Sequence, residues 1–473
     1  MKKNVFALLA VVALSGSLVG CNETKKEESN IINIRCWNTE FKDRLLLGYA
    51  DKIEKDNGDN TVTLKNGKKV VFSIVPNDGN QYQQALDSAL AADDSAATED
   101  KVDMFLMEAD YAKKYIDTDY TMDIKKVGLT DDDLKDMYGY TKTIVTNKDN
   151  VLKGVSWQAT LGLYAFRSDE AAKIWADYPA DSAGAQAQAD FVQEKISTWE
   201  KFNAVAATAK EKGIKMLSGY DDSYRTFSNN ASQSWVTENG DNLTVHLDDQ
   251  IKSWIKQTKE FTSKGYNNQN GLWSDGWAKD QGPTGDVFGF FYSTWGINFT
   301  LLGNSLADAD GEKKLGNGLF GKYRVCYGPA SYYWGGTWLS AAKNCNNLED
   351  VKDIMKVMTC DATIAEKITN ETQDYTNNKT AMKKLANTDF KSDFLGGQNH
   401  IKLFEKTADK IKLAPMSAYD QGCNEKIQNA MKDYFKTDNP ITFEEAITNF
   451  KTALRTLYPE IKDSSFDSSF NSL

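Results

Sequence analysis

Histidine is scarce in this chain, which has only two among its 473 residues, His246 and His400. Neither lies in a recognisable motif, so we expect neither a histidine-based catalytic triad nor a histidine-rich metal site. The chain also lacks the pattern G-x-x-x-x-G-K-[ST] of phosphate-binding loops, and nothing in it predicts ATP hydrolysis. We therefore expect no catalytic residues, no cofactor and no metal ion.

Cysteine is also sparse and irregularly placed. After Cys21 the cysteines are Cys36, Cys326, Cys345, Cys360 and Cys423. No two of them have the C-x-x-C spacing, and an odd, scattered set does not predict a disulfide framework or a zinc site. We expect mostly buried free thiols, with a single disulfide as the alternative.

Positive charge and long apolar runs are both in short supply. The formal net charge is −11, and it becomes −13 without Lys2 and Lys3. This balance argues against binding to nucleic acid, which needs a basic face, and against binding to anionic lipid by charge. After residue 20 the chain has no second long apolar run.

The first 20 residues have the pattern of a secretory signal peptide. Lys2 and Lys3 precede a short apolar stretch, Val5 to Leu14, and small residues follow. The stretch ends in Leu18-Val19-Gly20-Cys21, which resembles the bacterial lipobox, and that resemblance implies lipidation of Cys21. Residues 21–30 are then a polar, lipidated tether on the outer side of the bacterial cell membrane. The alternative is an ordinary secretory peptide with an incidental cysteine.

The region after the tether alternates strands and helices. Strands are predicted at Ile31–Trp37, Val70–Val75 and Val102–Met107, and each leads through a loop into a helix. This order is typical of a parallel α/β sheet, in which ligands bind at the carboxyl ends of the strands. The loops at 37–40, 78–81 and 108–110 should therefore share one edge of the sheet.

Glycine and aromatic residues mark a crossing point late in the chain. Tyr332, Tyr333 and Trp334 precede the pair Gly335-Gly336. Such a pair marks a place where the backbone turns freely or approaches another group closely. We interpret it as the segment where the chain returns from one lobe to the other beside a ligand cleft.

Several helix signals support the later part of the chain. Ser197-x-x-Glu200 and Thr442-x-x-Glu445 predict capping boxes, and Gly265 predicts a helix end. Apolar residues at helical spacing predict a helix over 348–358. Trp199 and Trp254 lie within amphipathic patterns and are assigned to the core, whereas Ser464–Leu473 is expected to fray.

The order of short segments along the chain resembles that of the extracellular solute-binding proteins of carbohydrate ABC importers, the maltose-binding-protein-like group. The segments are Ile34–Trp37, Val102–Phe105, Gly154–Trp157, Ser197–Glu200, Leu247-Asp248, Gly265, Trp295, Gly335-Gly336 and the helix at Tyr419. The resemblance implies two α/β lobes, each a mostly parallel sheet flanked by helices, with hinge crossovers and a sugar in the cleft. We expect lobe 1 to contain residues 31–155 and 336–395, and lobe 2 residues 156–335 and 396–473.

The aromatic content gives the expected cleft its chemistry. Aromatic faces cover the C–H faces of a pyranose ring, and polar side chains bind its hydroxyl groups. Tryptophans beside loops or glycine corners suit the walls: Trp37, Trp157, Trp295 and Trp334, with Gly335 and Gly336. Polar residues at strand and helix ends suit the edge: Glu40, Asn80, Glu108, Asp110, Gln158 and Asp420, with Arg225 as a further candidate.

The sequence therefore predicts a monomeric, lipid-anchored solute-binding protein that closes around an oligosaccharide and delivers it to a membrane permease. Three alternatives remain open. The ligand could be a peptide, a polyamine or an anion, and polyamine sites also combine aromatics with acids. The protein could be a secreted glycoside hydrolase with two carboxylates across the cleft. It could also be an outer-membrane sugar-binding lipoprotein, although such proteins are largely helical.

Overall fold

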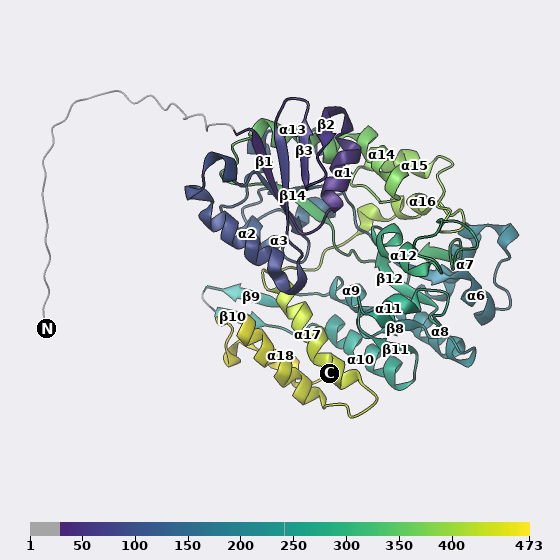
Figure 1. Cartoon of the computed structure of the whole chain (residues 1–473). Coiled ribbons are helices and arrows are strands. Elements are labelled where there is room, and N and C mark those ends of the chain that lie inside the picture. Colours follow the sequence, from purple (N-terminus) through teal and green to yellow (C-terminus); the bar gives the residue numbers. More distant parts are fainter. Residues whose placement is uncertain (1–28, 241) are drawn as a thin grey trace, which may run out of the picture.

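The computed structural model of the chain describes residues 29–240 and 242–473. Two lobes are visible in Figure 1, and the upper one is built on a seven-stranded sheet. The strand order is β2-β3-β4-β1-β5-β14-β6. These strands are β1 (Ile31–Cys36), β2 (Ile53–Asp56), β3 (Thr61–Leu64), β4 (Lys69–Ile74), β5 (Met104–Glu108), β6 (Val155–Ser156) and β14 (Thr337–Ala341).

The direction of the strands corrects one expectation. Strand β1 runs parallel to both of its neighbours, β4 and β5, as predicted. The other pairs of this sheet are antiparallel, because β2, β3 and β4 follow one another through tight turns and β14 enters from the other lobe. The α/β class is confirmed, but the prediction of mostly parallel sheets is wrong.

The lower lobe contains a smaller sheet. Strand β7 (Gly162–Arg167) pairs antiparallel with both β12 (Gly289–Ser293) and β13 (Tyr323–Cys326). A parallel bridge from Lys215 to Val287 brings the pair β8 (Leu217–Gly219) and β11 (Asn267–Asn270) to its edge. A separate hairpin joins β9 (Val236–Asn239) and β10 (Asn242–Val245).

Helices surround both sheets. In Figure 1 the upper lobe carries α1 (Glu40–Gly48), α2 (Gln81–Ala92), α3 (Ala112–Ile116), α13 (Leu348–Cys360), α14 (Ala362–Thr372) and α15 (Lys379–Ala386). The short helices α4 (Ile124–Val127) and α5 (Gly139–Ile144) contact its strands β14 and β6. The lower lobe carries α6 (Ser168–Ile174), α7 (Ala185–Lys195), α8 (Trp199–Glu211), α9 (Tyr224–Ser228), α10 (Asp249–Ser263), α11 (Asp275–Asp280), α12 (Leu302–Ser305), α17 (Asp420–Phe435) and α18 (Phe443–Leu457). Helix α16 (His400–Glu405) lies near the border.

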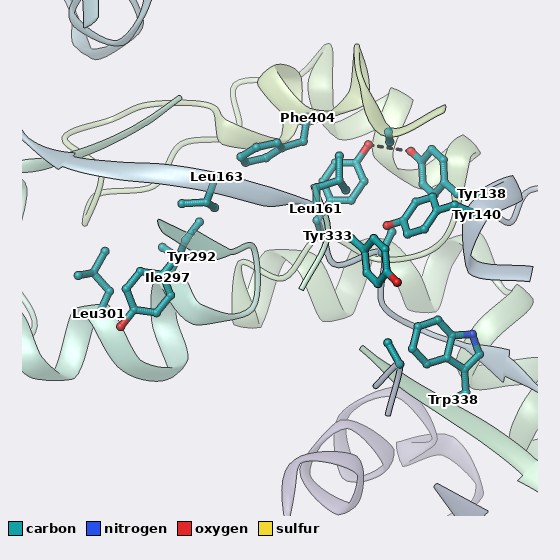
Figure 2. Close-up of a cluster of buried hydrophobic side chains, with 14 of the residues drawn as sticks. Tyr138, Tyr140, Leu161, Leu163, Tyr292, Ile297, Leu301, Tyr333, Trp338 and Phe404 are labelled. Carbon is teal, nitrogen blue, oxygen red and sulfur yellow. Dashed lines mark hydrogen bonds between the residues drawn. The ribbon is translucent and has the colours of Figure 1, made fainter. Parts of the chain in front are cut away.

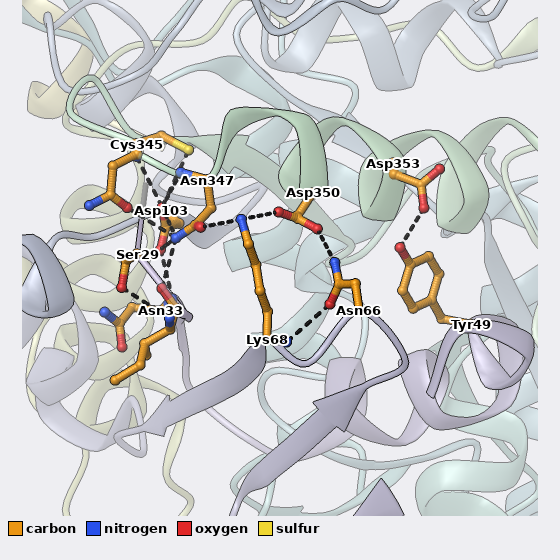
Figure 3. Close-up of polar contacts among 12 residues, drawn as sticks. Ser29, Asn33, Tyr49, Asn66, Lys68, Asp103, Cys345, Asn347, Asp350 and Asp353 are labelled. Carbon is orange, nitrogen blue, oxygen red and sulfur yellow. Dashed lines mark hydrogen bonds and ion pairs between the residues drawn. The ribbon is translucent and has the colours of Figure 1, made fainter. Parts of the chain in front are cut away.

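A buried polar network fixes helix α13 to the amino-terminal strands (Figure 3). The carboxylate of Asp103 accepts hydrogen bonds from the backbone N–H groups of Asn33 (2.8 Å) and Asn347 (3.1 Å). Lys68 donates to Asn347 and forms an ion pair with Asp350 at 2.7 Å. The network holds segments that lie more than 200 residues apart in sequence, and so it makes the upper lobe a single unit.

Two segments connect the sheets. Residues 157–161 lead from β6 to β7, and residues 327–336 lead from β13 back to β14. They lie side by side, with an antiparallel bridge between Leu161 and Tyr333 and a hydrogen bond from the N–H of Trp334 to the C=O of Thr160 (3.0 Å). Figure 2 shows the buried cluster around them, which joins Trp338 of the upper sheet to Leu163 and Tyr292 of the lower one.

Helix signals in the sequence are confirmed in part. Thr442 and Glu445 form the predicted capping box of α18, and Gly265 follows α10 with φ of 69°. The predicted box at Ser197 is wrong by one residue, because the hydroxyl of Thr198 accepts the hydrogen bond that caps α8. The predicted fraying of the end of the chain is wrong, because Phe470 is buried and stacks on Phe450.

The described residues also bear on anchoring, metals and thiols. No described helix is long and apolar enough to cross a membrane. Within residues 29–240 and 242–473, no group of three or more His, Cys, Asp or Glu side chains could hold a metal ion. Cys36, Cys326 and Cys423 are buried free thiols, and Cys360 is half-buried. Buried Cys345 contacts the carboxylate of Asp103. The signal peptide and Cys21 lie outside the described residues.

Candidate functional site

The carboxyl ends of β1 and β5 begin the site. These strands are parallel neighbours, so the segments that follow them, Trp37–Glu40 and Glu108–Asp110, lie at one edge of the sheet. Gln158, at the start of the first connecting segment, adds an amide at the same place. Its Nε2 donates a hydrogen bond to Oε1 of Glu40 at 2.7 Å.

A cavity of about 230 Å³ opens at this edge, between the strand ends and the second connecting segment. Its wall combines residues of the upper sheet, of both connecting segments, and of lower-lobe segments that follow β11 and β12. The lining residues are Trp37, Asn38, Glu40, Glu108, Gln158, Trp273, Trp295, Phe299, Trp334, Gly335, Gly336 and Thr337. Eight of the twelve predicted site residues are among them, so the structure brings most of the predicted set together.

Three tryptophans form one continuous aromatic wall. Trp295 lies edge-on to Trp334, with ring centroids 5.6 Å apart, and is stacked with Trp273 at 6.2 Å. The indole Nε1 of Trp295 donates to the backbone C=O of Trp334 at 2.9 Å. This hydrogen bond fixes the ring of Trp295 and leaves its face for a ligand.

Gly335 and Gly336 make room for this wall. Their φ angles are 70° and 110°, which L side chains rarely adopt. A Cβ atom at Gly335 would stand 3.2 Å from Nε1 of Trp295 and 3.5 Å from Oε1 of Glu108. The glycine pair therefore serves the close approach that the sequence predicts.

Glu40 and Glu108 are the acidic residues of the cavity wall. Burial, together with the nearby carboxylate of Asp374, raises the pKa of Glu40 to about 7, although Arg44 opposes the shift. Burial, together with Asp110, raises the pKa of Glu108 to about 8, although Arg225 opposes it. Both carboxyl groups therefore take up protons near neutral pH.

A second hollow lies beside the first and holds the other predicted acids. Asp110 and Asp420 line it, together with Arg225. Arg225 forms a two-pronged ion pair with Asp110, in which Nη1 and Oδ1 are 2.7 Å apart. The guanidinium also lies 5.4 Å from the centroid of the Trp334 ring. Burial raises the pKa of Asp420 to about 6, against the hydrogen bonds that it accepts from Ser417.

Two predicted residues lie elsewhere. Trp157 is only 1% exposed and packs against Phe41 in the core of the upper lobe, so the expectation that it forms a cleft wall is corrected. Its position directly before the cavity residue Gln158 explains the error, because successive side chains point in different directions. Asn80 does not line the cavity, and its Oδ1 accepts a hydrogen bond from Gln421 of α17 at 3.0 Å.

Sequence reasoning missed four lining residues: Asn38, Trp273, Phe299 and Thr337. Trp273 gave a signal in the sequence, because it lies between Gly271 and Gly276 in a segment with a second tryptophan, Trp277. The structure shows Trp273 53% exposed with φ of 66°, whereas Trp277 is buried in α11. Phe299 is 65% exposed and lies in a short π-helix over Ile297–Leu301. Its position gave no signal in the sequence.

Two α/β lobes, joined by hydrogen-bonded connecting segments beside an aromatic cavity, define the class of two-lobed periplasmic binding proteins. The chain belongs to the family of bacterial extracellular solute-binding proteins, whose model matches residues 49–394. No curated protein sequence matches the chain significantly.

Solved structures share the fold. An extracellular solute-binding protein of family 1 has a TM-score of 0.65 at 16% identity, over 90% of this chain and 99% of the other. A binding protein from B. animalis subsp. lactis Bl-04, in complex with beta-1,6-galactobiose, has a TM-score of 0.62 at 17% identity, over 92% and 98%. The galacto-N-biose-/lacto-N-biose I-binding protein from Bifidobacterium longum has a TM-score of 0.60 at 13% identity, over 91% and 96%.

Proposed function

We propose that this chain is the solute-binding component of an ABC importer and that it binds an oligosaccharide between its lobes. The observation that carries the proposal is the cavity wall, where four tryptophans and Phe299 surround two carboxyl groups and two amides. Indole faces cover the C–H faces of sugar rings, while the polar groups bind hydroxyls. The sugars bound by structural neighbours from two bifidobacteria support this choice.

More than one sugar ring fits the surroundings of the wall. Trp273 and Trp334 also line a further hollow of about 300 Å³, together with Arg225, Gln428 and Asn429. A ligand that extends past these two indoles would contact polar groups of α17. This continuity favours an oligosaccharide over a monosaccharide.

The mechanism that we propose is hinge closure. Residues 31–155 and 336–395 would move as one lobe, and residues 156–335 and 396–473 as the other. A ligand held by both lobes favours the closed form, because only that form offers all of its contacts. The closed monomer would then dock on a membrane permease. We expect no cleavage of the sugar, and incubation with oligosaccharides followed by product analysis tests this against the glycoside hydrolase alternative.

Location at the membrane is part of the proposal. The segment Leu18-Val19-Gly20-Cys21 supports lipidation of Cys21, which would hold the protein at the outer side of the cell membrane. Metabolic labelling with a palmitate analogue should mark the wild-type protein and leave Cys21→Ser unmarked. Equal labelling of both proteins would contradict the anchor.

A thermal-shift screen tests the ligand class. A ligand that binds only the folded protein raises the melting temperature, so one glycan family should raise it by several degrees, on the order of 5 °C at saturation. Trp273→Ala and Trp295→Ala should abolish this rise, whereas Leu315→Ala, which removes an exposed apolar side chain outside the cavity, should preserve it. A response to polyamines or peptides, without any response to saccharides, would reject the carbohydrate assignment.

A further inference from the structure

The charge of the cavity wall is unbalanced. Among its lining residues, Glu40 and Glu108 are acidic, and no Lys or Arg is present. The two nearest guanidinium groups are engaged by other acids. Nη2 of Arg44 lies 2.7 Å from Oδ2 of Asp374, but 3.9 Å from Oε1 of Glu40. Arg225 pairs with Asp110 through both of its Nη atoms.

Each carboxyl group has one oxygen engaged and one available. Oε1 of Glu40 accepts the hydrogen bond from Gln158, and Oε2 of Glu108 accepts one from the backbone N–H of Asp110 at 2.7 Å. No group of the described chain donates a hydrogen bond to the remaining oxygen of either residue. Oε1 of Glu108 lies close to Gly335, which lines the cavity. The wall therefore presents two carboxyl groups that become negatively charged acceptors when they lose their protons, and it presents no group with positive charge.

The aromatic part of the wall has the same preference. The face of an indole carries negative partial charge and attracts cations, most strongly where water is displaced. Trp37, Trp273, Trp295 and Trp334 all line the cavity that contains the two carboxyl groups. Beside a neutral sugar the two enclosed carboxyl groups would stay protonated, because an unmatched buried carboxylate is unfavourable. A cationic group on the ligand would instead stabilise their ionised form.

We infer that the ligand is a saccharide with a protonated amino group, and that Glu108, assisted by Glu40, selects it. This inference rests on the proposed carbohydrate function and adds the chemical class of the sugar. The ammonium group forms charge-assisted hydrogen bonds with the available carboxylate oxygens, while the ring lies on the indole faces. A hydroxyl or acetamido group at the same carbon of the sugar provides no charge.

Matched saccharides test the inference by isothermal titration calorimetry. We would use disaccharides of the gluco, galacto and manno series, in which the same carbon carries an amino, an acetamido or a hydroxyl group. In the series that binds, the amino form should bind about tenfold or more tightly than the other two, and added salt should reduce this advantage. Equal or tighter binding of a neutral form would overturn the inference and leave the carbohydrate function intact.

Loss of all saccharide binding would reject the carbohydrate function itself, and not only the amino-sugar inference. If no saccharide of any series binds, or if a linear polyamine alone binds, both the carbohydrate function and the amino-sugar inference fail. The two failures are therefore distinguishable in one set of titrations.

Charge-removing variants identify the selecting residue. Glu108→Gln and Glu40→Gln keep the size of each side chain, and each should reduce the ratio of amino-form to neutral-form affinity, measured within the same variant, about tenfold. Glu211→Gln, on the exposed face of α8, is the matched control and should bind as the wild type does. An unchanged preference in Glu108→Gln, in a variant with wild-type melting behaviour, would overturn the role of Glu108.

Discussion

At the scale of single residues, the place of Glu108 in the fold determines the pKa of its carboxyl group. The residue ends β5, where a parallel strand directs its last side chain toward the ligand edge of the sheet. There it is enclosed beside Asp110, and both burial and the neighbouring negative charge oppose its ionisation. The same side chain on an exposed helix would be a simple surface charge.

We expect Glu108 to make the stability of the unliganded protein depend on pH. Its pKa rises from 4.5 to about 8 on folding, so between these values the folded state holds a proton that the unfolded state has lost. The free energy of unfolding therefore falls as pH rises from about 4.5 to about 8. Glu108→Gln should flatten this fall and stabilise the protein at pH 8 by on the order of 2 kcal/mol. Urea unfolding of both proteins at pH 5, 6.5 and 8 measures this pH dependence of the free energy of unfolding.

Glu211→Gln serves as the control, because Glu211 is exposed on α8. Its pH profile should follow that of the wild-type protein. A Glu108→Gln profile that is indistinguishable from the wild type would show that Glu108 does not carry the proton.

Gly336→Ala should destabilise the fold by about 1–3 kcal/mol, because an L side chain is strained at φ of 110°. The new Cβ would also lie 2.9 Å from the ring of Trp338. Gly303→Ala, within helix α12 and with nothing near its Cβ position, should be neutral or slightly stabilising. Thermal unfolding compares the two variants. Equal melting temperatures for Gly336→Ala and Gly303→Ala would contradict the steric argument.

At the scale of elements, the end of the chain is held by packing that local composition does not reveal. The Ser-rich segment after α18 contains Phe466 and Phe470, which lie edge-to-face with ring centroids 5.5 Å apart. Ser469 also accepts a hydrogen bond from the backbone N–H of Leu247 at 2.8 Å. The segment therefore packs on α18 and is hydrogen-bonded to the residues just before α10; we call it the carboxyl-terminal clamp.

Phe470→Ala should cost about 3–5 kcal/mol, because Phe470 is 3% exposed and stacks on Phe450 at 5.8 Å. The matched control is Phe299→Ala, since Phe299 is largely exposed and its loss should change stability by about 0.5 kcal/mol or less. Chemical denaturation of both variants gives the comparison. Similar losses would mean that the clamp contributes nothing beyond the removal of a phenyl ring.

At the scale of the whole molecule, polar contacts join the lobes across the cleft. Arg225 of α9 pairs with Asp110 after β5, and Gln421 of α17 reaches Asn80 and Gln83 at the start of α2. These contacts are local and polar, whereas the connecting segments are embedded in a buried cluster (Figure 2). Polar contacts of this kind break at small cost, so the arrangement suits two rigid bodies that separate at the cleft and stay joined at the connecting segments.

Arg225→Met should increase the average separation of the lobes in the unliganded protein. The change removes the ion pair with Asp110 and keeps an apolar side chain of similar length. Small-angle X-ray scattering should show a radius of gyration larger by about 1 Å, with an unchanged circular dichroism spectrum. Arg455→Met, which removes a surface ion pair with Asp463, should leave the scattering unchanged. The same scattering from both variants would show that the Asp110 pair does not hold the lobes.

The sequence by itself determined the local features of this protein. Patterns within a few residues predict strand β1, the glycine turn at Gly335-Gly336 and the helix cap at Thr442. The rule that ligands meet the carboxyl ends of parallel strands was sufficient to bring Trp37, Glu40 and Glu108 to one cavity. Such features depend on local backbone geometry, which neighbouring residues set.

Only the tertiary structure decided which side chains face that cavity. Trp157 is buried and Trp273 is exposed, although both are tryptophans in loops or at loop edges. Asp110 lies in an adjacent hollow, where it pairs with Arg225, which is more than 100 residues away in the chain, and Asp420 lines the same hollow from the start of α17. Burial and pairing of this kind depend on segments that are distant in the chain and meet only on folding, so no local pattern contains them.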